Sequence, residues 1–192
     1  MDIIKQSIEA SIATKQQILS DALLVERIKE VAHVMVKALR NGNRVLWCGN
    51  GGSAADAQHL AAELSGRFYY DRPPLNSEAL HCNTSYITAV GNDYGYDLIY
   101  SRMIDGATRP GDVLVGISTS GNSKNICNAF DKARQNQVIT IAMTGATGGE
   151  MKNKADYLLN VPSCDTPRIQ ESHIMIGHII CQIVEAEIFP NV

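Results

Sequence analysis

The chain has 192 residues, of which 45% are hydrophobic and 19% charged, so it is the size of one ordinary domain with enough apolar surface to fold. This composition excludes a disordered or membrane-embedded chain. The formal net charge is -3 and the lysines and arginines are scattered, which argues against a nucleic-acid partner and favours a small anionic ligand.

Two helices are expected before the first strand. In residues 2–19 isoleucine recurs every fourth position, which is one apolar stripe of a helix. Residues 21–40 repeat apolar side chains with helical spacing, and Gly42 follows as a stop signal. We expect residues 1–40 to serve in packing or oligomerisation, and residues 41–192 to form the α/β core and a C-terminal helix within one domain, 1–192.

The core begins with a strand, a glycine-rich loop and a helix. Residues 44–48 form a short apolar run that predicts a buried strand, residues 49–53 form the loop, and residues 54–64 are rich in alanine and leucine. Ser53 is expected to cap this helix. The same order returns in residues 112–117, 118–123 and 124–135, which indicates a diverged internal repeat.

Further strands are predicted at residues 138–143 and 158–161, and a weaker one at 78–82. Strands that alternate with helices and are apolar on both faces predict a parallel sheet with right-handed crossovers. The chain closes with a long helix at 167–189, whose less apolar face carries His173 and His178. The expected fold class is therefore α/β, with a parallel sheet between helices.

The two loops are candidate phosphate sites. A glycine-rich turn before a helix presents unpaired N–H groups to an anion, although a capped tight turn explains the first loop equally well. The second loop is more informative, because hydroxyls cluster at the C-terminal end of a strand, at Ser118, Thr119, Ser120 and Ser123. Neither loop has the Gly-Lys-Ser/Thr or Gly-x-Gly-x-x-Gly pattern of nucleotide sites, so a monophosphate fits better, with a polar surface turn as the alternative.

Several titratable or polar side chains are candidates for the chemistry. His59 and Glu63 share one face of the third helix, as a metal pair, an acid–base pair or an exposed polar face. Gln170 and His178 are ~80° and ~12 Å apart on the last helix, so one small site hardly reaches both. His178, like His173, is otherwise a core or interface histidine. Asn92 and Asp93, in a turn-prone stretch, either contact sugar hydroxyls or form a turn.

The cysteines indicate the compartment. They are odd in number, widely spaced and without a Cys-x-x-Cys pair, which predicts reduced thiols in a cytoplasmic protein. No apolar run approaches the ~20 residues of a membrane span, and we expect neither a targeting segment nor a membrane partner.

Five segments taken together resemble the phosphoheptose isomerase family of the sugar isomerase (SIS) domain superfamily. The resemblance spans nearly the whole chain, and the segments are Cys-Gly-Asn-Gly-Gly-Ser at 48–53, residues 59–67, Val-Gly-Asn-Asp-Tyr-Gly at 90–95, residues 116–123, and Arg-Ile-Gln-Glu at 168–171. Five ordered motifs are far more specific than any one loop. This resemblance implies an SIS-type parallel-sheet sandwich.

The resemblance also implies an activity, which is isomerisation of sedoheptulose 7-phosphate to D-glycero-D-manno-heptose 7-phosphate for bacterial lipopolysaccharide or capsule. It implies a homotetramer and one zinc ion per active site, bound through the residues that match His59, Glu63, Gln170 and His178. Glu63 matches the base and His178 the acid. The residues that match substrate contacts are Asn50, Gly51, Gly52, Ser53, Glu63, Arg67, Asn92, Asp93, Ser118, Thr119, Ser120, Ser123 and Gln170.

These residue types suit an aldose–ketose isomerase, which moves a proton between neighbouring carbons through an enediol. A Glu that binds zinc through both oxygens is a poor base, so the two roles of Glu63 compete. Family members carry Asp directly before the Arg-Ile-Gln segment, where this chain has Pro167, with Asp165 two positions earlier.

Two expectations concern other chains. Because Gln170 and His178 are far apart on their helix, we expect one of them to come from another subunit, which would build the active site at an interface. In the alternative, Gln170 lies just before the helix, where the backbone can curl toward the site. The competing function is that of a non-catalytic SIS protein that binds the bacterial replication initiator. That group lacks the acid matching Glu63 and the His matching His178, both of which this chain has.

Overall fold

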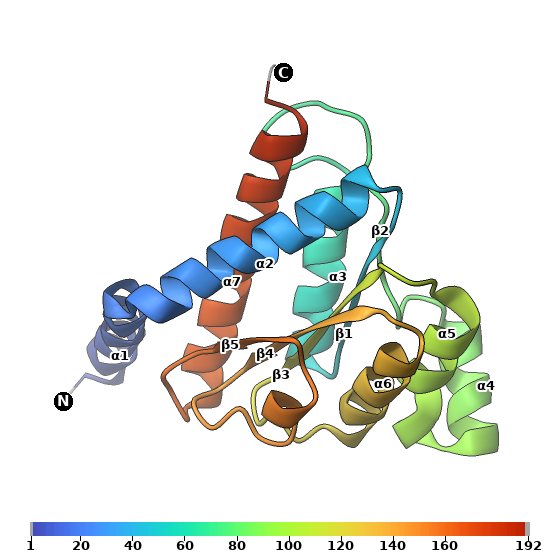
Figure 1. Ribbon diagram of the computed structural model, residues 1–192. Coiled ribbons are helices and arrows are strands. Elements are labelled where there is room, and N and C mark those ends of the chain that lie inside the picture. The colour runs from blue at the N-terminus through green and yellow to red at the C-terminus, as the bar shows by residue number, and fades with distance from the viewer. Residues whose placement is uncertain (1, 191–192) are drawn as a thin grey trace.

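A five-stranded parallel sheet forms the centre of the computed structural model, which describes residues 2–190 (Figure 1). The spatial order is β2-β1-β3-β4-β5. The strands are β1 (Val45–Gly49), β2 (Ser77–Ala79), β3 (Val113–Ser118), β4 (Ile139–Thr144) and β5 (Tyr157–Asn160). The four strands expected with most support are confirmed as parallel neighbours, and the weaker one is the short edge strand β2.

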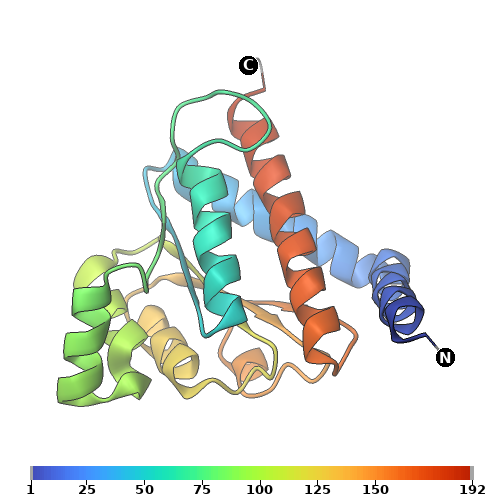
Figure 2. The same ribbon diagram turned by 180° about the vertical axis from the view of Figure 1, so that it is seen from behind.

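Helices cover both faces of the sheet, as Figures 1 and 2 show. One layer holds α2 (Ala22–Arg40), α3 (Gly52–Ser65) and α7 (Thr166–Ile188). The other holds α4 (Thr84–Tyr94), α5 (Ile99–Ala107) and α6 (Lys124–Gln135). The remaining pieces are α1 (Ile3–Ser20), which lies against α7, and the 3-10 turns η1 (Tyr96–Leu98) and η2 (Met151–Asn153). The expected α/β sandwich is therefore confirmed.

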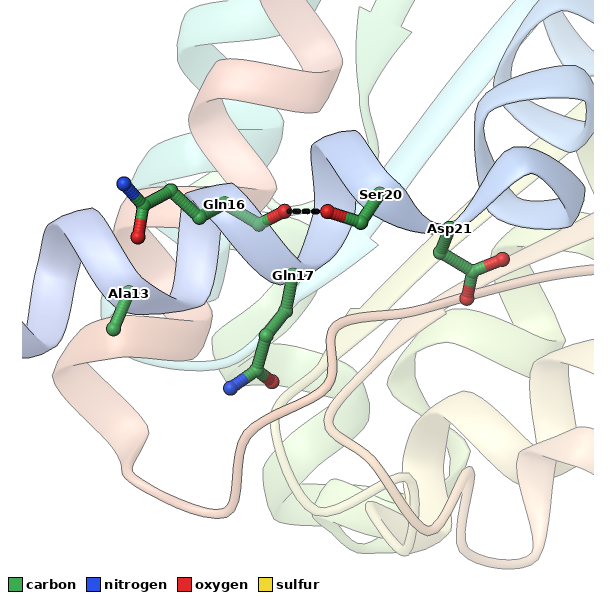
Figure 3. Close-up of a pocket in the computed structure, with 5 residues that line it drawn as sticks. All are labelled: Ala13, Gln16, Gln17, Ser20 and Asp21. Carbon is green, nitrogen blue, oxygen red and sulfur yellow. Dashed lines mark hydrogen bonds between the residues drawn. The ribbon is translucent and has the colours of Figure 1, made fainter.

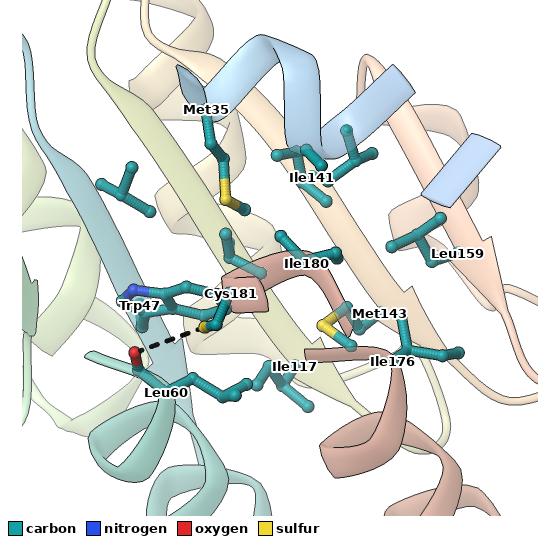
Figure 4. Close-up of a cluster of buried hydrophobic side chains, with 14 of the residues drawn as sticks. Met35, Trp47, Leu60, Ile117, Ile141, Met143, Leu159, Ile176, Ile180 and Cys181 are labelled. Carbon is teal, nitrogen blue, oxygen red and sulfur yellow. Dashed lines mark hydrogen bonds between the residues drawn. The ribbon is translucent and has the colours of Figure 1, made fainter. Parts of the chain in front are cut away.

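The inner strands β1, β3 and β4 are mostly apolar because their successive side chains point to opposite buried layers. Val45 and Trp47 pack among residues of α2, α3 and α7, whereas Leu46 and Cys48 pack on the α5 and α6 side. Figure 4 shows the first of these clusters, where Trp47, Leu60 and Cys181 meet below α2. The two layers thus have separate apolar cores on either side of one sheet.

Three local expectations are wrong. The cap of α3 is Gly51, whose backbone begins the helix, and Ser53 lies inside the first turn. The stretch predicted as a turn around Asn92 and Asp93 is the last turn of α4, because the Asn83 side chain accepts the Tyr86 N–H and starts a helix there. His173 and His178 do not share a face of α7, since His173 is fully buried over the sheet.

The order in which strands are added to the sheet reverses between β1 and β3, and the candidate site lies at this point. The helix after β1 lies in one layer and the helix after β3 in the other, so the loops that follow these strands diverge at the C-terminal edge of the sheet. Such a switch point is where open α/β sheets bind ligands. The expectation that residues 49–53 and 118–123 lie at the same edge is confirmed.

Candidate active site

Two helices bring three potential ligand side chains together. His59 and Glu63 are one turn apart on α3, and Glu63 Oε1 lies 2.9 Å from His59 Nε2. His178 comes from α7, and its Nε2 lies 3.1 Å from His59 Nε2. Ligand atoms of all three residues lie within 4.8 Å of one another. The His59–Glu63 pair expected from the sequence therefore has a third potential ligand, His178, which an isolated polar face of a helix would lack.

The geometry of this triad suits a small metal ion. Adjacent ligand atoms of a tetrahedral zinc site with bonds of ~2.0–2.1 Å lie ~3.3 Å apart. The observed separations of 2.9 Å and 3.1 Å are close to that value. Two imidazoles and a carboxylate are also a donor set that zinc accepts in catalytic sites. The three side chains thus fit a three-ligand centre with an open position.

Gln170, the fourth expected metal ligand, does not lie at the triad. Helices α3 and α7 run side by side in the same direction (Figure 2), with Gln170 beside Gly52 and His178 beside His59. A methyl group at position 52 would come within 2.6 Å of the Gln170 amide nitrogen, so the glycine makes room for this side chain. Gln170 is thereby about two helical turns, ~12 Å, from His178. One chain assembles the triad without it, and His178 does not need to come from a second subunit.

Side-chain amides join the glycine loop to the first turn of α6. Asn50 and Asn125 exchange a reciprocal pair of hydrogen bonds, both of 2.9 Å, and Asn125 is buried. The phenol of Tyr96 also donates to Asn50 Oδ1 at 3.0 Å. The glycine loop is therefore fixed against both α6 and η1. Asn125 and Tyr96 were not among the predicted site residues, and no motif spacing marks them.

The hydroxyls of the second loop gather as expected. Ser118 is buried, and its Oγ lies 2.9 Å from Ser123 Oγ and 3.5 Å from Ser120 Oγ. Ser120 is exposed and Thr119 half-buried. No lysine or arginine belongs to this loop, so hydroxyls and backbone N–H groups are its own means of holding an anion.

The remaining predicted residues lie in two separate places. Asn92 and Asp93 are exposed at the end of α4, where the Asn92 amide donates to Asp93 Oδ1 at 2.8 Å. They approach the glycine loop through the nearby Tyr96, on the side of the sheet opposite the triad. Arg67 is exposed just beyond the end of α3. Asn92 and Asp93 therefore lie on the side of the glycine loop, whereas Arg67 lies at the opposite end of α3, ~20 Å further along that helix.

Burial shapes the electrostatics next to the triad. Desolvation raises the pKa of the Asp56 carboxyl, an effect that the neighbouring His59 partly offsets. Asp56 Oδ2 has no hydrogen-bond partner within residues 2–190. Desolvation also lowers the pKa of His81, which a hydrogen bond with the Ala54 backbone partly offsets. Burial thus disfavours the charged forms of Asp56, on α3, and of His81, in the segment after β2.

An aromatic contact at the triad was also not predicted from the sequence. The Phe68 ring stacks on the His178 ring, with centroids 5.6 Å apart and planes at 29°. Phe68 belongs to the segment after α3, where the buried carboxylate of Glu185 accepts the Phe68 N–H at 3.0 Å. A phenylalanine after a helix carries no signal of such a role in the sequence.

Two surface hollows differ in chemical content. One of about 490 Å³ lies on the outer face of α3 beside the triad, lined by Ala55, Gln58, His59, Ala62 and Glu63. The other, of about 440 Å³, lies at the junction of α1 and α2 (Figure 3) and is lined by Ala13, Gln16, Gln17, Ser20 and Asp21. In the second hollow, Ser20 bonds its own helix and Asp21 caps α2. Only the first contains groups arranged for catalysis.

Comparison with known proteins agrees with this arrangement. Residues 9–145 match the SIS domain family. Over 190 residues the chain is 52% identical to a phosphoheptose isomerase of Aneurinibacillus thermoaerophilus, covering 99% of this chain and 96% of that protein. The chain belongs to the phosphoheptose isomerase family. A second family member, from Sulfurimonas denitrificans, is 54% identical over 186 residues, or 97% of this chain and 95% of that protein.

Solved structures of phosphoheptose isomerases have the same fold. The structure from Neisseria gonorrhoeae superposes with a TM-score of 0.89 at 43% identity, covering 95% of this chain and 97% of that one. The structure from Francisella tularensis gives a TM-score of 0.92 at 39% identity, covering 95% and 96%. The family's fold thus extends over nearly the whole chain.

Proposed function

We propose that the protein is an isomerase that converts sedoheptulose 7-phosphate to D-glycero-D-manno-heptose 7-phosphate, in heptose synthesis for lipopolysaccharide or capsule. The observation that carries this proposal is the meeting of Glu63 with His59 and His178 on the helix that follows the switch-point loop. These are the groups that a proton-transferring isomerase needs. The close relatives named phosphoheptose isomerase support the assignment.

The spacing within the site matches the length of the substrate. The phosphate and the carbonyl of this sugar are at opposite ends of a seven-carbon chain, which with C–C bonds of ~1.5 Å spans ~8 Å. The loops lie at the N-terminal end of α3, and His59 is seven residues, ~10 Å, further along that helix. A phosphate at the loops therefore leaves the reacting carbons near the triad.

Each group has a defined task in the proposed reaction. Hydroxyls and N–H groups of residues 118–123 hold the phosphate, while Asn50, Arg67, Asn92, Asp93 and Gln170 contact the sugar. The Glu63 carboxylate removes the proton from the carbon beside the carbonyl. The His178 imidazole donates a proton to the substrate oxygen. Gly51, Gly52 and Ser53 present backbone N–H groups at the start of α3.

We assign one zinc ion per active site to His59, Glu63 and His178, because their separations fit tetrahedral coordination. When bound, zinc supplies polarisation of the substrate carbonyl. Gln170 of the same chain is two turns away, so as a fourth ligand it would come from another subunit. Glu63 serves as base with the oxygen that does not bind metal.

We also propose a homotetramer with active sites at subunit interfaces. The supporting observation is a continuous apolar surface on α1, whose side chains at Ile3, Ile4, Ile8 and Ile12 are exposed. A patch of this kind marks an interaction surface. Residues 1–40 would then pack between subunits, while residues 41–192 complete the single SIS domain.

Two observations bear on location. The five cysteines are all unpaired within the described residues, which fits a cytoplasmic enzyme. Among residues 2–190, no helix is both long enough and apolar enough to cross a membrane.

The competing function is that of a non-catalytic SIS protein that binds the replication initiator. The comparisons favour the isomerase, since the close relatives carry that name. The adjacency of Glu63 and His178 supports the same choice, because a binding protein has no use for a proton-transfer pair.

The proposal is tested by incubating the protein with sedoheptulose 7-phosphate and following the aldose product by NMR. Glu63→Gln keeps the shape of the side chain but removes the base, so turnover should fall by at least ~10². Exchange of the substrate C1 proton with deuterated solvent should be lost as well. A parent rate of exchange in the variant would exclude Glu63 as base. Zinc content, measured on both proteins, shows whether the lost activity reflects the base or the metal.

A further inference from the structure

The segment that joins α3 to β2 passes beside the C-terminal end of α7 before it returns to the sheet (Figure 2). In this segment, the ring centroid of Phe68 lies 5.6 Å from that of the His178 imidazole. The rings of Phe68 and Tyr69 pack edge to face, with centroids 4.6 Å apart. The His178 imidazole therefore has two aromatic neighbours, the tilted ring of His59 and the stacked ring of Phe68. These contacts restrict rotation of the His178 ring about its own bond to the helix.

A buried ion pair fixes the position of Phe68. The side chains of Arg72 and Glu185 are 0% and 1% exposed, and Arg72 Nε lies 2.9 Å from Glu185 Oε1. The same carboxylate accepts the backbone N–H groups of Phe68 and Tyr69, at 3.0 Å and 2.8 Å. Both oxygens of Glu185 are thus occupied by the segment that carries Phe68.

Arg72 ties this segment to the end of α3. Its guanidinium donates to the carbonyls of Glu63 and Leu64 at 2.8 Å each, and to that of Gly66 at 2.9 Å. These are carbonyls that a helix end leaves without partners, and a cation there is favoured by the helix dipole. Since Glu185 lies seven residues after His178 on α7, the pair connects both helices that carry the triad.

We propose that Phe68 is a positioning residue that holds the His178 imidazole in its reactive orientation, with Arg72 and Glu185 as its support. The Phe68 ring has no proton to give and stacks on the His178 ring, so its effect passes through His178. This inference rests on the proposed role of His178 in proton transfer. It adds the requirement that a ring outside the triad hold the His178 imidazole in a fixed orientation.

The test is a double-mutant cycle on turnover of sedoheptulose 7-phosphate. Phe68→Leu keeps apolar bulk but removes the flat ring, and kcat should fall about 10-fold or more while KM changes less than about twofold. In a His178→Gln background, the same change should have no further effect on kcat, because residues that act as a unit are not additive. An equal loss in both backgrounds would overturn the proposal.

Two matched variants separate orientation from general disturbance of the segment. Phe68→Tyr retains the ring and should keep kcat within about threefold of the parent, and a loss as large as that of Phe68→Leu would contradict a role for the ring face. Tyr70→Phe removes a hydrogen bond from the same segment to the Phe189 carbonyl, and should leave turnover unchanged. A loss there equal to that of Phe68→Leu would assign the effect to the loop.

A measurement without substrate completes the design. A proton held over an aromatic face is shifted upfield, so the ring protons of His178 in the NMR spectrum should move downfield in Phe68→Leu and stay near the parent position in Phe68→Tyr. Unchanged His178 signals in Phe68→Leu would refute the contact. Parent turnover in His178→Gln, by contrast, would reject the proposed function of His178 and leave the contact itself standing.

Discussion

His173 is a buried histidine that carries no charge in the folded protein at neutral pH. Its side chain is fully buried, and Nε2 lies 3.0 Å from the Thr144 carbonyl oxygen. Burial lowers the pKa of His173 to about 4, although the hydrogen bond to Thr144 partly offsets the shift. The second ring nitrogen has no hydrogen-bond partner within the described residues. Addition of a second proton, which would give the charged imidazolium, is therefore strongly disfavoured.

This pKa predicts a loss of stability in acid. Between the unfolded pKa of about 6.5 and the folded value near 4, the unfolded chain binds a proton that the folded protein refuses, so stability is complete above pH 6.5 and decreases below it. The total loss amounts to roughly 3 kcal/mol. Urea unfolding between pH 7 and 4 should show this slope in the parent and a shallower one in His173→Gln. Parallel curves would contradict the shift.

At the scale of single residues, the sequence predicts what is local. The pairing of His59 with Glu63 follows from helical spacing and is found. The position of His178 beside His59, and of Gln170 beside Gly52, depends on how α7 packs against α3. The spacing of residues within one helix does not determine this packing. Asn125, Tyr96 and Phe68 were missed for the same reason, since their contacts join segments that are far apart in sequence.

At the scale of elements, α3 and α7 approach closely where a glycine removes a side chain. A methyl group at Gly177 would lie 2.4 Å from Leu60 Cδ1, and both residues are buried in the same interface. This contact is adjacent in sequence to His178 and His59, so it sets how near the two histidines come. The glycine thereby determines the spacing of the triad.

Gly177→Ala should therefore impair catalysis. The added methyl group overpacks the interface, which destabilises by roughly 1–3 kcal/mol, partly offset by ~1 kcal/mol of helix propensity. Displacement of His178 by a fraction of an ångström should reduce kcat at least about 10-fold. The matched control is Gly106→Ala in α5, where nothing lies within 4 Å, and turnover should be unchanged. Parent kcat in a folded Gly177→Ala protein would contradict this role of the glycine.

Most of the predicted elements end within one or two residues of those found, but the helices α4 and α5 were not predicted. Short apolar runs marked four of the five strands, because parallel strands buried on both faces are mostly apolar, whereas β2 is Ser-Glu-Ala at the edge of the sheet. Helix α4 was not predicted, because its last turn contains the glycine, asparagine and aspartate that usually mark turns. Its N-terminal cap at Asn83 was the signal that identifies it.

At the scale of the whole molecule, the apolar stripe of α1 has no cover within the described chain. Ile8 and Ile12 are 54% and 51% exposed, although their spacing is that of a core-facing helix. Nearby, α1, α2 and α7 line an apolar hollow of about 580 Å³ that includes Ile18, Met175 and Ile183. This surface is the expected contact between subunits.

A double substitution, Ile8→Glu with Ile12→Glu, should weaken the oligomer. Glutamate retains helix propensity, but its charge is disfavoured in an apolar interface. Sedimentation velocity at micromolar concentration should show smaller species than the parent, and turnover should fall with them if the sites lie at interfaces. Glu9→Lys, at an exposed position on the same helix, serves as the control. An unchanged sedimentation coefficient would place the subunit contacts elsewhere.

The sheet divides the site into two parts with separate apolar cores. The triad belongs to the layer of α3 and α7, whereas Asn92, Asp93 and Asn125 belong to the layer of α4, α5 and α6. With the site roles proposed above, substitutions in the second layer would alter which hydroxyls are recognised without repacking the helices that hold the proposed acid and base. Descendants of this fold can therefore acquire new sugars by changing one layer, while inheriting the proton-transfer chemistry of the other unchanged.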